Sequence, residues 1–319
     1  MKGKMGLFGR NFNKPGPGVP KDQPRKTGAA RFFELFFRDF SDLVKLNLLF
    51  CLVVAPSAIL YILGIAPYVL SNYELLFFDA AELPMEITPE FTEYYGINFI
   101  FLILSLILAF PIGGAIVAYV YYITKMMRDD PSYVWFEFKR KLKENIRQAA
   151  PVGIICTAFI YMQILMWFQV FFQLVDGGYS GGLLWFLLAI LSILLFGMIT
   201  PYIFLHYAYI DLKTFQIIKN SMLMTFAYLP RSFMGGLLGG ITWIIIALQF
   251  PNSLVIFPLV LLLLISLSFL LTLSWVWPPF NKCFDIEETL KKRLEDETEE
   301  NSDSKSELGE SISKTEKND

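Results

Sequence analysis

The sequence has few charged residues and lacks the motifs of zinc-dependent and phosphate-binding catalytic sites. Charged residues make up 18% of the 319-residue chain, whereas they usually make up about a quarter of a soluble domain. There are one histidine and three cysteines, with no C-x-x-C pair, so a zinc site is not indicated. The HExxH and GxxxxGK(S/T) motifs are also missing. We therefore expect a non-enzymatic protein with no metal, no cofactor and no nucleic-acid partner.

Hydrophobic residues are abundant instead, and they lie in long uncharged blocks. They make up 55% of the chain, whose mean hydropathy is +0.50. A bilayer core about 30 Å thick needs about 20 apolar residues of helix. The blocks predict an all-α membrane protein with six transmembrane helices, near residues 46–70, 97–124, 151–174, 183–209, 233–250 and 254–277. The last two spans share one block, in which Gln249-Phe-Pro-Asn-Ser253 is expected to form the turn.

The basic residues predict the orientation of these spans. Ten of the 27 Lys and Arg residues precede span one, seven lie between spans two and three, three lie between spans four and five, and seven follow span six. The loops after spans one, three and five contain none. Because cytoplasmic loops accumulate Lys and Arg, we expect a multi-pass plasma-membrane protein with both termini in the cytoplasm.

Three segments follow from this pattern. Residues 1–30 are expected to form a flexible basic cytoplasmic leader, and residues 31–284 the membrane domain. Residues 285–319 contain 13 acidic and 6 basic residues and are expected to form a cytoplasmic tail, largely disordered after a short helix near residue 286. The outer loop between spans one and two carries six carboxylates and no base. It fits either a divalent-cation or lid site, or a solvated acidic surface with Thr88 and Pro89 beginning the next helix.

An amphipathic helix is predicted before each odd-numbered span. The same helical offsets recur in three sets: Phe33, Phe36, Phe40, Val44 and Asn47; Trp135, Phe138, Leu142, Ile146 and Ala149; and Phe215, Ile218, Met222, Phe226 and Leu229. Opposite the second set stand Lys139, Arg140, Lys143, Glu144 and Arg147, and Asp130 with Pro131 would start this helix. Such helices lie in the membrane interface and meet anionic lipid. The chain therefore reads as three units, each an interfacial helix followed by a hairpin of two spans.

Three stretches resemble a known family. The segments MGLFGRNFNKPGPGV (5–19), RFFELFFRDFSDLVKLNLL (31–49) and DDPSYVWFEFKRKLKENIRQA (129–149) are similar, in wording and order, to the YesL family of bacterial membrane proteins. The similarity extends from the leader to about residue 280. Members of this essentially uncharacterised family typically occur beside components of carbohydrate ABC transporters. The resemblance implies a Gram-positive, Bacillus-like source and a role near sugar uptake or its regulation, and it assigns no catalytic or ligand residue.

Few polar side chains fall inside the predicted spans, where they are costly and rarely idle. His206 lies near the inner end of span four, with Asp211 at its edge, and is either a proton relay or a hydrogen-bonded residue between helices. Span three carries Gln163, Gln169 and Gln173, with Trp167 among them. Gln169 and Gln173, with Trp185 on the next span, fit either a sugar-binding rim or the ordinary polar and aromatic residues of a membrane boundary.

Span five begins with two overlapping GxxxG pairs, Gly235 with Gly239 and Gly236 with Gly240. Small residues at this spacing let helix backbones approach closely. The pairs predict either packing inside the bundle or contact with a second protein, which would be another copy of this chain or a partner permease.

Together these features favour an accessory or regulatory subunit for carbohydrate ABC transport, with ABC transporter permease subunits as partners and homo-oligomers left open. The alternative is an autonomous transporter or facilitator channel for a small uncharged solute such as a sugar, in which three hairpins around an axis would enclose a polar path. An intramembrane enzyme that depends on His206 is the weakest interpretation.

Overall fold

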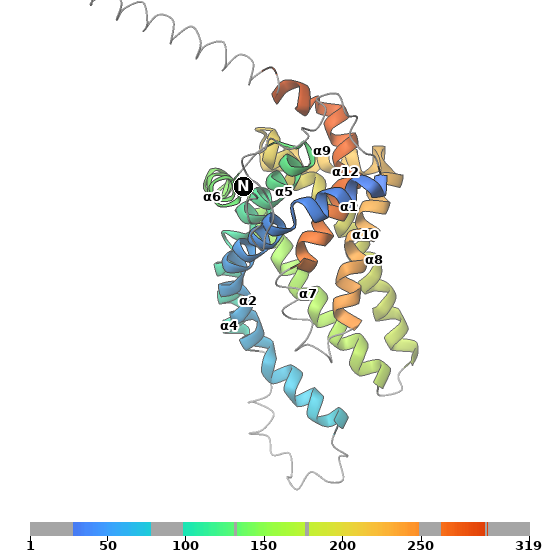
Figure 1. The fold of residues 1–319 in the computed structure, drawn as a ribbon. Helices are drawn as coiled ribbons and strands as arrows, with labels where there is room; N and C mark the ends of the chain where they lie inside the picture. The colour runs from blue at the N-terminus through green and yellow to red at the C-terminus, as the bar shows by residue number, and fades with distance from the viewer. Residues whose placement is uncertain are drawn as a thin grey trace, which may run out of the picture.

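The computed structural model describes residues 28–77, 98–130, 133–175, 179–248, 263–290 and 292. The elements that these residues form are helices, as the sequence predicted: α1 Gly28–Arg38, α2 Phe40–Phe77, α4 Phe99–Leu108, α5 Ile112–Met127, α6 Val134–Asn145, α7 Ala150–Val175, α8 Tyr179–Tyr209, α9 Thr214–Ala227, α10 Leu229–Leu248 and α12 Ile265–Phe284 (Figure 1). Residues 28–30, predicted as the end of the leader, belong to α1. The rest of the leader, the acidic outer loop with Thr88 and Pro89, the turn at 249–253 and the tail beyond residue 292 lie outside the described residues.

Several of the helices are long and apolar enough to cross a membrane. Phe40–Pro67, Ala150–Val170 and Gly182–Tyr209 meet this requirement singly. A fourth span results if α4 and α5, which are bent by 46° relative to each other, are counted as one. These helices indicate a membrane-embedded protein.

The described residues do not reach the predicted count of six spans. The helices at the fifth and sixth positions, α10 and α12, are not among the candidate spans. The described part of α12 begins only at Ile265 and ends in Trp-Pro-Pro-Phe-Asn-Lys-Cys-Phe, and α10 begins with Leu-Pro-Arg-Ser. Polar and proline residues at these ends shorten the apolar length that each helix offers to a bilayer.

The predicted second span is broken rather than continuous. The first part, α4, ends at Leu108, and α5 begins at Ile112, with Pro111 at the break. Proline has no N–H to donate to the preceding turn, and its ring clashes with the helical path. The amides of Ala109 and Phe110 donate to carbonyls three residues back, as in a tighter helix. The segment 97–124, predicted as one span, is therefore two helices bent by 46° at Pro111.

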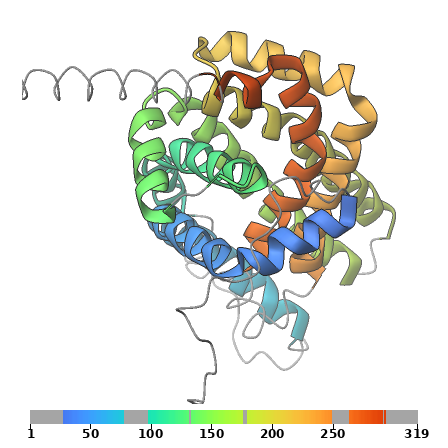
Figure 2. The same cartoon turned by 45° about the horizontal axis from the view of Figure 1, so that its top comes forward.

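The centre of the described bundle is occupied by α5. All residues from Ile112 to Val120 are buried, and α2, α6, α7, α8 and α12 contact this helix. Figure 2 shows it surrounded by other helices. The hydroxyl of the buried Tyr119 lies 2.7 Å from Oγ of Ser266 on α12 and 3.3 Å from Oδ1 of Asn47 on α2. A packed helix, held by polar contacts to its neighbours, therefore fills the axis.

Glycines bring α5 and α7 into backbone contact. A Cβ atom added at Gly153 would collide with the backbone of Gly113, and one added at Gly113 would collide with the carbonyl of Ala149. A Cβ at Gly114 would lie 2.9 Å from Cα of Ile146, just after α6. Because real side chains cannot occupy such positions, these glycines allow the central helix to sit against the α6–α7 corner.

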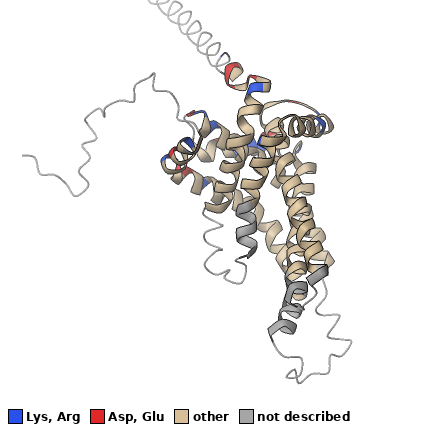
Figure 3. Cartoon of the chain, turned by 90° about the vertical axis from the view of Figure 1, so that its right-hand side faces the viewer, with Lys and Arg blue, Asp and Glu red and all other residues tan. Residues whose placement is uncertain are grey.

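Short helices occur at the three positions where amphipathic helices were predicted. The three, α1, α6 and α9, directly precede α2, α7 and α10 and lie at the same end of the bundle (Figure 1). Charged residues of the described part gather at this end, whereas the long helices below it are almost free of charge (Figure 3). This order agrees with the predicted repeat to the extent that a short helix comes before each of the long helices α2, α7 and α10.

The predicted apolar stripes do not mark the buried faces of α1 and α9. On α1 and the start of α2 the residues in the core are Leu35, Leu43 and Leu46, whereas Phe33 and Phe40 are exposed. On α9, Ile217 and Met224 are buried, and the predicted stripe, with Phe226 70% exposed, faces outward. The helical period finds an apolar stripe, but in a membrane protein both the core and the lipid accept apolar side chains, so the period alone does not distinguish them.

Candidate functional site

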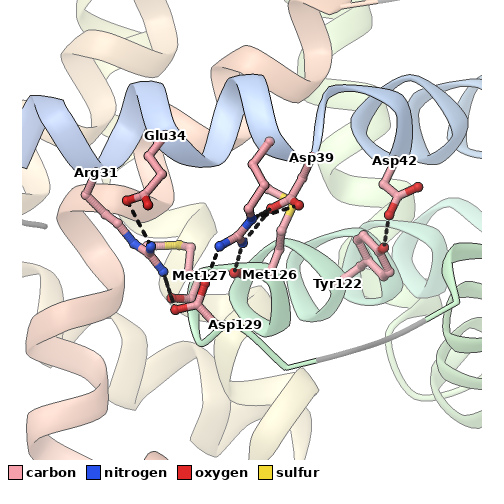
Figure 4. Close-up of polar contacts among 9 residues, drawn as sticks. Arg31, Glu34, Asp39, Asp42, Tyr122, Met126, Met127 and Asp129 are labelled. Carbon is pink, nitrogen blue, oxygen red and sulfur yellow. Dashed lines mark hydrogen bonds and ion pairs between the residues drawn. The ribbon is translucent and has the colours of Figure 1, made fainter. Parts of the chain in front are cut away.

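The most elaborate polar structure is a cluster that ties α1 and α6 to the C-terminal end of α5. We call it the charged layer, and it consists of Arg31, Arg38, Asp39, Lys125, Arg128, Asp129, Asp130, Glu137 and Arg140. Its residues come from α1, α5 and α6, from the junction between α1 and α2, and from the turn between α5 and α6. Figure 4 shows the part formed by α1 and the end of α5.

Asp129 joins two arginines of α1. Nη2 of Arg31 donates to Oδ2 of Asp129 at 2.6 Å, and Nη1 of Arg38 donates to Oδ1 at 2.5 Å (Figure 4). The same guanidinium groups also donate to the carbonyl oxygens of Met127 and Met126. These carbonyls belong to the last turn of α5, where the helix dipole favours positive charge. The two arginines therefore close the C-terminus of α5 and hold α1 across it.

The backbone at Asp129 adopts a left-handed conformation, with φ of 64°. Glycine or asparagine usually ends a helix in this way. Aspartate tolerates the conformation, and here it also supplies the carboxylate for the arginines. Partial burial opposes ionisation of this carboxyl group, but the hydrogen bonds from Arg38 and Arg31 outweigh it and lower the pKa of Asp129 below its ordinary value.

A surface hollow of about 310 Å³ lies beside the ion pair of Arg38 and Asp129. Its lining consists of Arg38, Asp39, Asp42, Tyr122, Met126, Asp129 and Asp130. Asp39 binds Arg38 and Asp42 binds Lys45, so these carboxylates are already paired. Within the described ranges no group of three His, Cys, Asp or Glu residues is placed to hold a metal ion. The hollow is therefore a polar groove between α1, α2 and α5 rather than a metal site.

Arg128 is the most deeply buried base of the charged layer. Its side chain is 5% exposed, and its Nε donates to Oδ2 of Asp130 at 2.9 Å. Nη1 donates to the hydroxyl of Tyr209 on α8 at 2.7 Å, and the guanidinium also lies over the rings of Tyr209 and Trp277. Burial would lower the pKa of Arg128, but Tyr209 and Asp130 raise it above its ordinary value. Arg128 thus joins α5, α8 and α12 as a charged side chain between aromatic rings.

Glu137 fixes α6 to α5. Nζ of Lys125 lies 2.8 Å from Oε1 of Glu137, and Arg140 binds the other carboxylate oxygen. Burial opposes ionisation, yet the contacts with these two bases lower the pKa of Glu137. Arg140, predicted as a base facing lipid, is therefore paired within the protein.

The predicted faces of α6 need one correction. Phe138 is in the core at 4% exposure, but Trp135, expected on the same face, is 62% exposed. The buried side of α6 is formed by Val134, Glu137, Phe138 and Asn145. Because α6 packs on α5 through this buried side, Trp135 lies outside the contact and is exposed. Lys139, Lys143 and Arg147 are exposed, as predicted.

The predicted start of α6 also differs. Its N-cap is Tyr133 rather than Asp130, because Asp130 is held by Arg128 in the turn before the helix.

His206 is fully buried on α8. Its Nδ1 lies 2.7 Å from the carbonyl oxygen of Tyr202 and 3.1 Å from Oγ of Ser221 on α9. A carbonyl oxygen only accepts, so Nδ1 carries a proton in this contact. Nε2 is buried without a hydrogen-bond partner in the described structure, and Phe280 and Phe284 of α12 meet the ring edge-on. Asp211 is exposed, so the one carboxylate expected nearby does not share this environment.

The predicted glutamines do not converge in the described part. Nε2 of Gln163 donates to Oγ of Ser192 on α8 at 2.6 Å, while its buried Oε1 has no partner there. Gln169 is half-buried. Gln173 lies on α7, but its side chain is outside the described residues. Trp167 packs edge-on against Phe186 of α8 rather than standing free for a ligand.

Both GxxxG pairs face helices of this chain. Gly235 and Gly239 lie against α12, where Thr272 donates to the carbonyl oxygen of Gly235 and Ser268 to that of Gly239. On the other side of α10, a Cβ at Gly236 would lie 3.2 Å from the backbone of Gly197 on α8, and one at Gly240 would lie 3.4 Å from Ile193. These four glycines are therefore occupied by packing inside the bundle.

Sequence reasoning assigned no role to Arg31, Arg38, Arg128 or Asp129. The signal available was the run Arg128-Asp129-Asp130 directly after an apolar segment, and the two arginines seven residues apart before span one. No pattern in the sequence says that these two places meet.

Comparison with known proteins adds no assignment: no family model, no curated protein and no solved structure matches this chain.

Proposed function

We propose that this chain is a six-span plasma-membrane protein with both termini in the cytoplasm, and that it acts as a non-enzymatic accessory or regulatory subunit of a carbohydrate ABC transporter. The resemblance of three segments to the YesL family supports the link to sugar uptake. The observation that carries the non-conducting role is the position of α5, which is packed in the centre of the bundle.

A facilitator built from three hairpins would need a polar path between them. In the described bundle the axis is filled by α5, whose residues from Ile112 to Val120 are buried against other helices. Tyr119, the large polar side chain of that stretch, is engaged with Ser266. A filled axis with satisfied polar groups favours a structural or regulatory role over conduction.

The orientation is supported by the charged layer. Charges gather at the end of the bundle that holds α1, α6 and α9 (Figure 3), and Lys and Arg accumulate on the cytoplasmic side of membrane proteins. The six-span count is supported by the packing of α10 along α12, with Ser268 and Thr272 bonded to glycine carbonyls of α10. Such close packing fits a hairpin of two spans.

The topology is tested by labelling single cysteines with a membrane-impermeant maleimide. Cys283 is exposed in the last turn of α12 and is one probe, and Glu82→Cys in a Cys283→Ala background places the other in the acidic loop, with Cys51 and Cys156 replaced by alanine in both. We expect Glu82→Cys to react in intact cells and Cys283 to react only after permeabilisation. Labelling of Cys283 in intact cells would overturn the proposed orientation.

The function is tested by purifying the tagged protein in mild detergent from cells grown on different polysaccharides. Stoichiometric recovery of an ABC permease is the expected result. In parallel, liposomes that contain the purified protein alone should take up no labelled sugar. Sugar uptake without a partner would overturn the accessory role and identify an autonomous facilitator.

A further inference from the structure

The outer face of α6 carries a stripe of side chains that the bundle does not use. Trp135, Lys139 and Lys143 follow one another at intervals of four residues and so lie along one side of α6, and Arg147 follows in the turn between α6 and α7. All four are exposed. We call them the α6 stripe.

The bases of this stripe differ from their neighbours in lacking an acidic partner. Arg140 binds Glu137 and Lys141 binds Glu144, and Lys125 and Arg128 are also paired. Lys139, Lys143 and Arg147 form no ion pair with any residue that the structure describes. Four other described bases also lack an ion pair, but they are scattered over α10, α12 and α9 with its N-cap: Lys213, Lys219, Arg231 and Lys282.

The stripe stands next to a candidate membrane span. The apolar segment of α7 begins at Ala150, three residues after Arg147 and seven after Lys143. Three residues span at most about 11 Å even when fully extended, so Arg147 lies near the headgroup layer beside the hydrocarbon core.

Exposed aromatic rings stand at the other end of the same helix. Tyr133, Trp135 and Phe136 are 85%, 62% and 64% exposed. Aromatic rings of this kind concentrate at membrane interfaces, where an apolar body meets a polar surface. Unpaired bases beside exposed rings are the features that bind an interfacial helix to an anionic bilayer.

We propose that the α6 stripe is a binding site for anionic phospholipid, with Lys139, Lys143 and Arg147 holding the headgroup phosphates and Trp135 lying at the acyl boundary. The proposal concerns lipid binding and does not depend on the accessory function. The competing occupant is the acidic tail of this chain, in which residues 295–303 contain six acids and no base. The aromatic rings favour lipid, because they would have no role in binding such a segment.

The test is a titration of the purified full chain with phosphatidylglycerol or phosphatidylcholine, with bound lipids counted by native mass spectrometry. We expect a preference for phosphatidylglycerol that falls about tenfold or more in Lys139→Gln/Lys143→Gln/Arg147→Gln, because each base near the membrane contributes to attraction. The matched control is Lys213→Gln/Lys219→Gln/Arg231→Gln, which removes as many bases from the same end and should keep the preference.

A charge-preserving variant separates binding from folding. Lys139→Arg/Lys143→Arg/Arg147→Lys should retain the preference, while Trp135→Ala should weaken binding of both lipids. An unchanged preference in the glutamine variant, or an equal loss in the control, would overturn the proposal. The proposal would also be overturned if the full chain showed no preference for phosphatidylglycerol but acquired one after residues 293–319 were removed. The acidic tail would then be the occupant of the α6 stripe.

Discussion

Nη1 of Arg38 lies 2.5 Å from Oδ1 of Asp129, across 91 residues of sequence. The arginine ends α1 and the aspartate follows α5, so one contact joins the first helix to the central one. Arg31 binds the second oxygen of the same carboxylate. Since α1 leads directly into α2, this contact also sets where the first candidate span meets the bundle.

Replacement of Asp129 should loosen α1. We expect Asp129→Asn to lower the free energy of unfolding by about 1–2 kcal/mol, because charge-assisted hydrogen bonds of a partly exposed pair are lost. Asparagine tolerates the left-handed backbone, so the change isolates the charge. Thermal unfolding in detergent measures the effect, and Asp211→Asn, at an exposed carboxylate, is the control. Equal melting temperatures for the two variants would contradict the assigned role of Asp129.

The stabilisation by Asp129 should depend on pH in one direction. Its pKa is lowered in the folded protein, so the contribution is fully present above the ordinary carboxyl pKa of about 3.9 and is lost as the pH falls through the lower folded value. We expect the difference in Tm between the wild type and Asp129→Asn to be constant above about pH 5 and to shrink below about pH 4. Glu137 also has a lowered pKa, but its contribution to stability is the same in the wild type and in Asp129→Asn and therefore cancels in the difference. A difference that grew on acidification would show that the sign is wrong.

The glycine contacts between helices predict two unequal alanine variants. At Gly153 a Cβ would meet the backbone of Gly113, which has no flexible end to move, whereas at Gly240 it would lie 3.4 Å from a methyl group of Ile193. We expect Gly153→Ala to destabilise the protein by about 3 kcal/mol or more through overpacking. Gly240→Ala should change stability by less than about 1 kcal/mol. The yield and Tm of monodisperse protein compare the two, and similar losses would argue against the close crossing of α5 and α7.

The sequence predicted the helices well and their faces poorly. Uncharged blocks and short amphipathic stretches placed α2, α7 and α8 and the three short helices, because length and helical period are local properties. The side that each helix buries depends on its neighbours. The sequence offered the stripe that contains Phe33, yet Leu35 and Leu43, outside that stripe, are the residues that reach the core.

The charged layer was out of reach for a related reason. Arg38 and Asp129 meet because α5, bent by 46° from α4, ends beside α1, which lies 91 residues away in the sequence. A single sequence shows the bases and the acids but not which of them meet. The glycines illustrate the same limit, since GxxxG predicted close packing but did not indicate that α12 and α8 occupy the two sides of α10.

Arg128 allows a graded test of the contact between α5, α8 and α12. Its guanidinium is 5% exposed and binds Asp130 and the hydroxyl of Tyr209, so Arg128→Leu should cost about 2–4 kcal/mol through the loss of a buried, hydrogen-bonded charge. Arg128→Lys keeps the charge but not the planar fork, and it should cost roughly half as much. Tyr209→Phe removes one hydrogen-bond partner and should cost about 1 kcal/mol.

An exposed base provides the comparison. Lys139→Leu, at a position without an acidic partner in the described part of the chain, should alter stability by no more than about 0.5 kcal/mol. Thermal unfolding in the same detergent should therefore rank Arg128→Leu as the least stable, followed by Arg128→Lys, Tyr209→Phe and Lys139→Leu. If Arg128→Leu unfolded together with Lys139→Leu, the guanidinium would not hold the three helices together. The attachment of the end of α5 would then rest on the ion pairs of Arg31, Arg38 and Lys125.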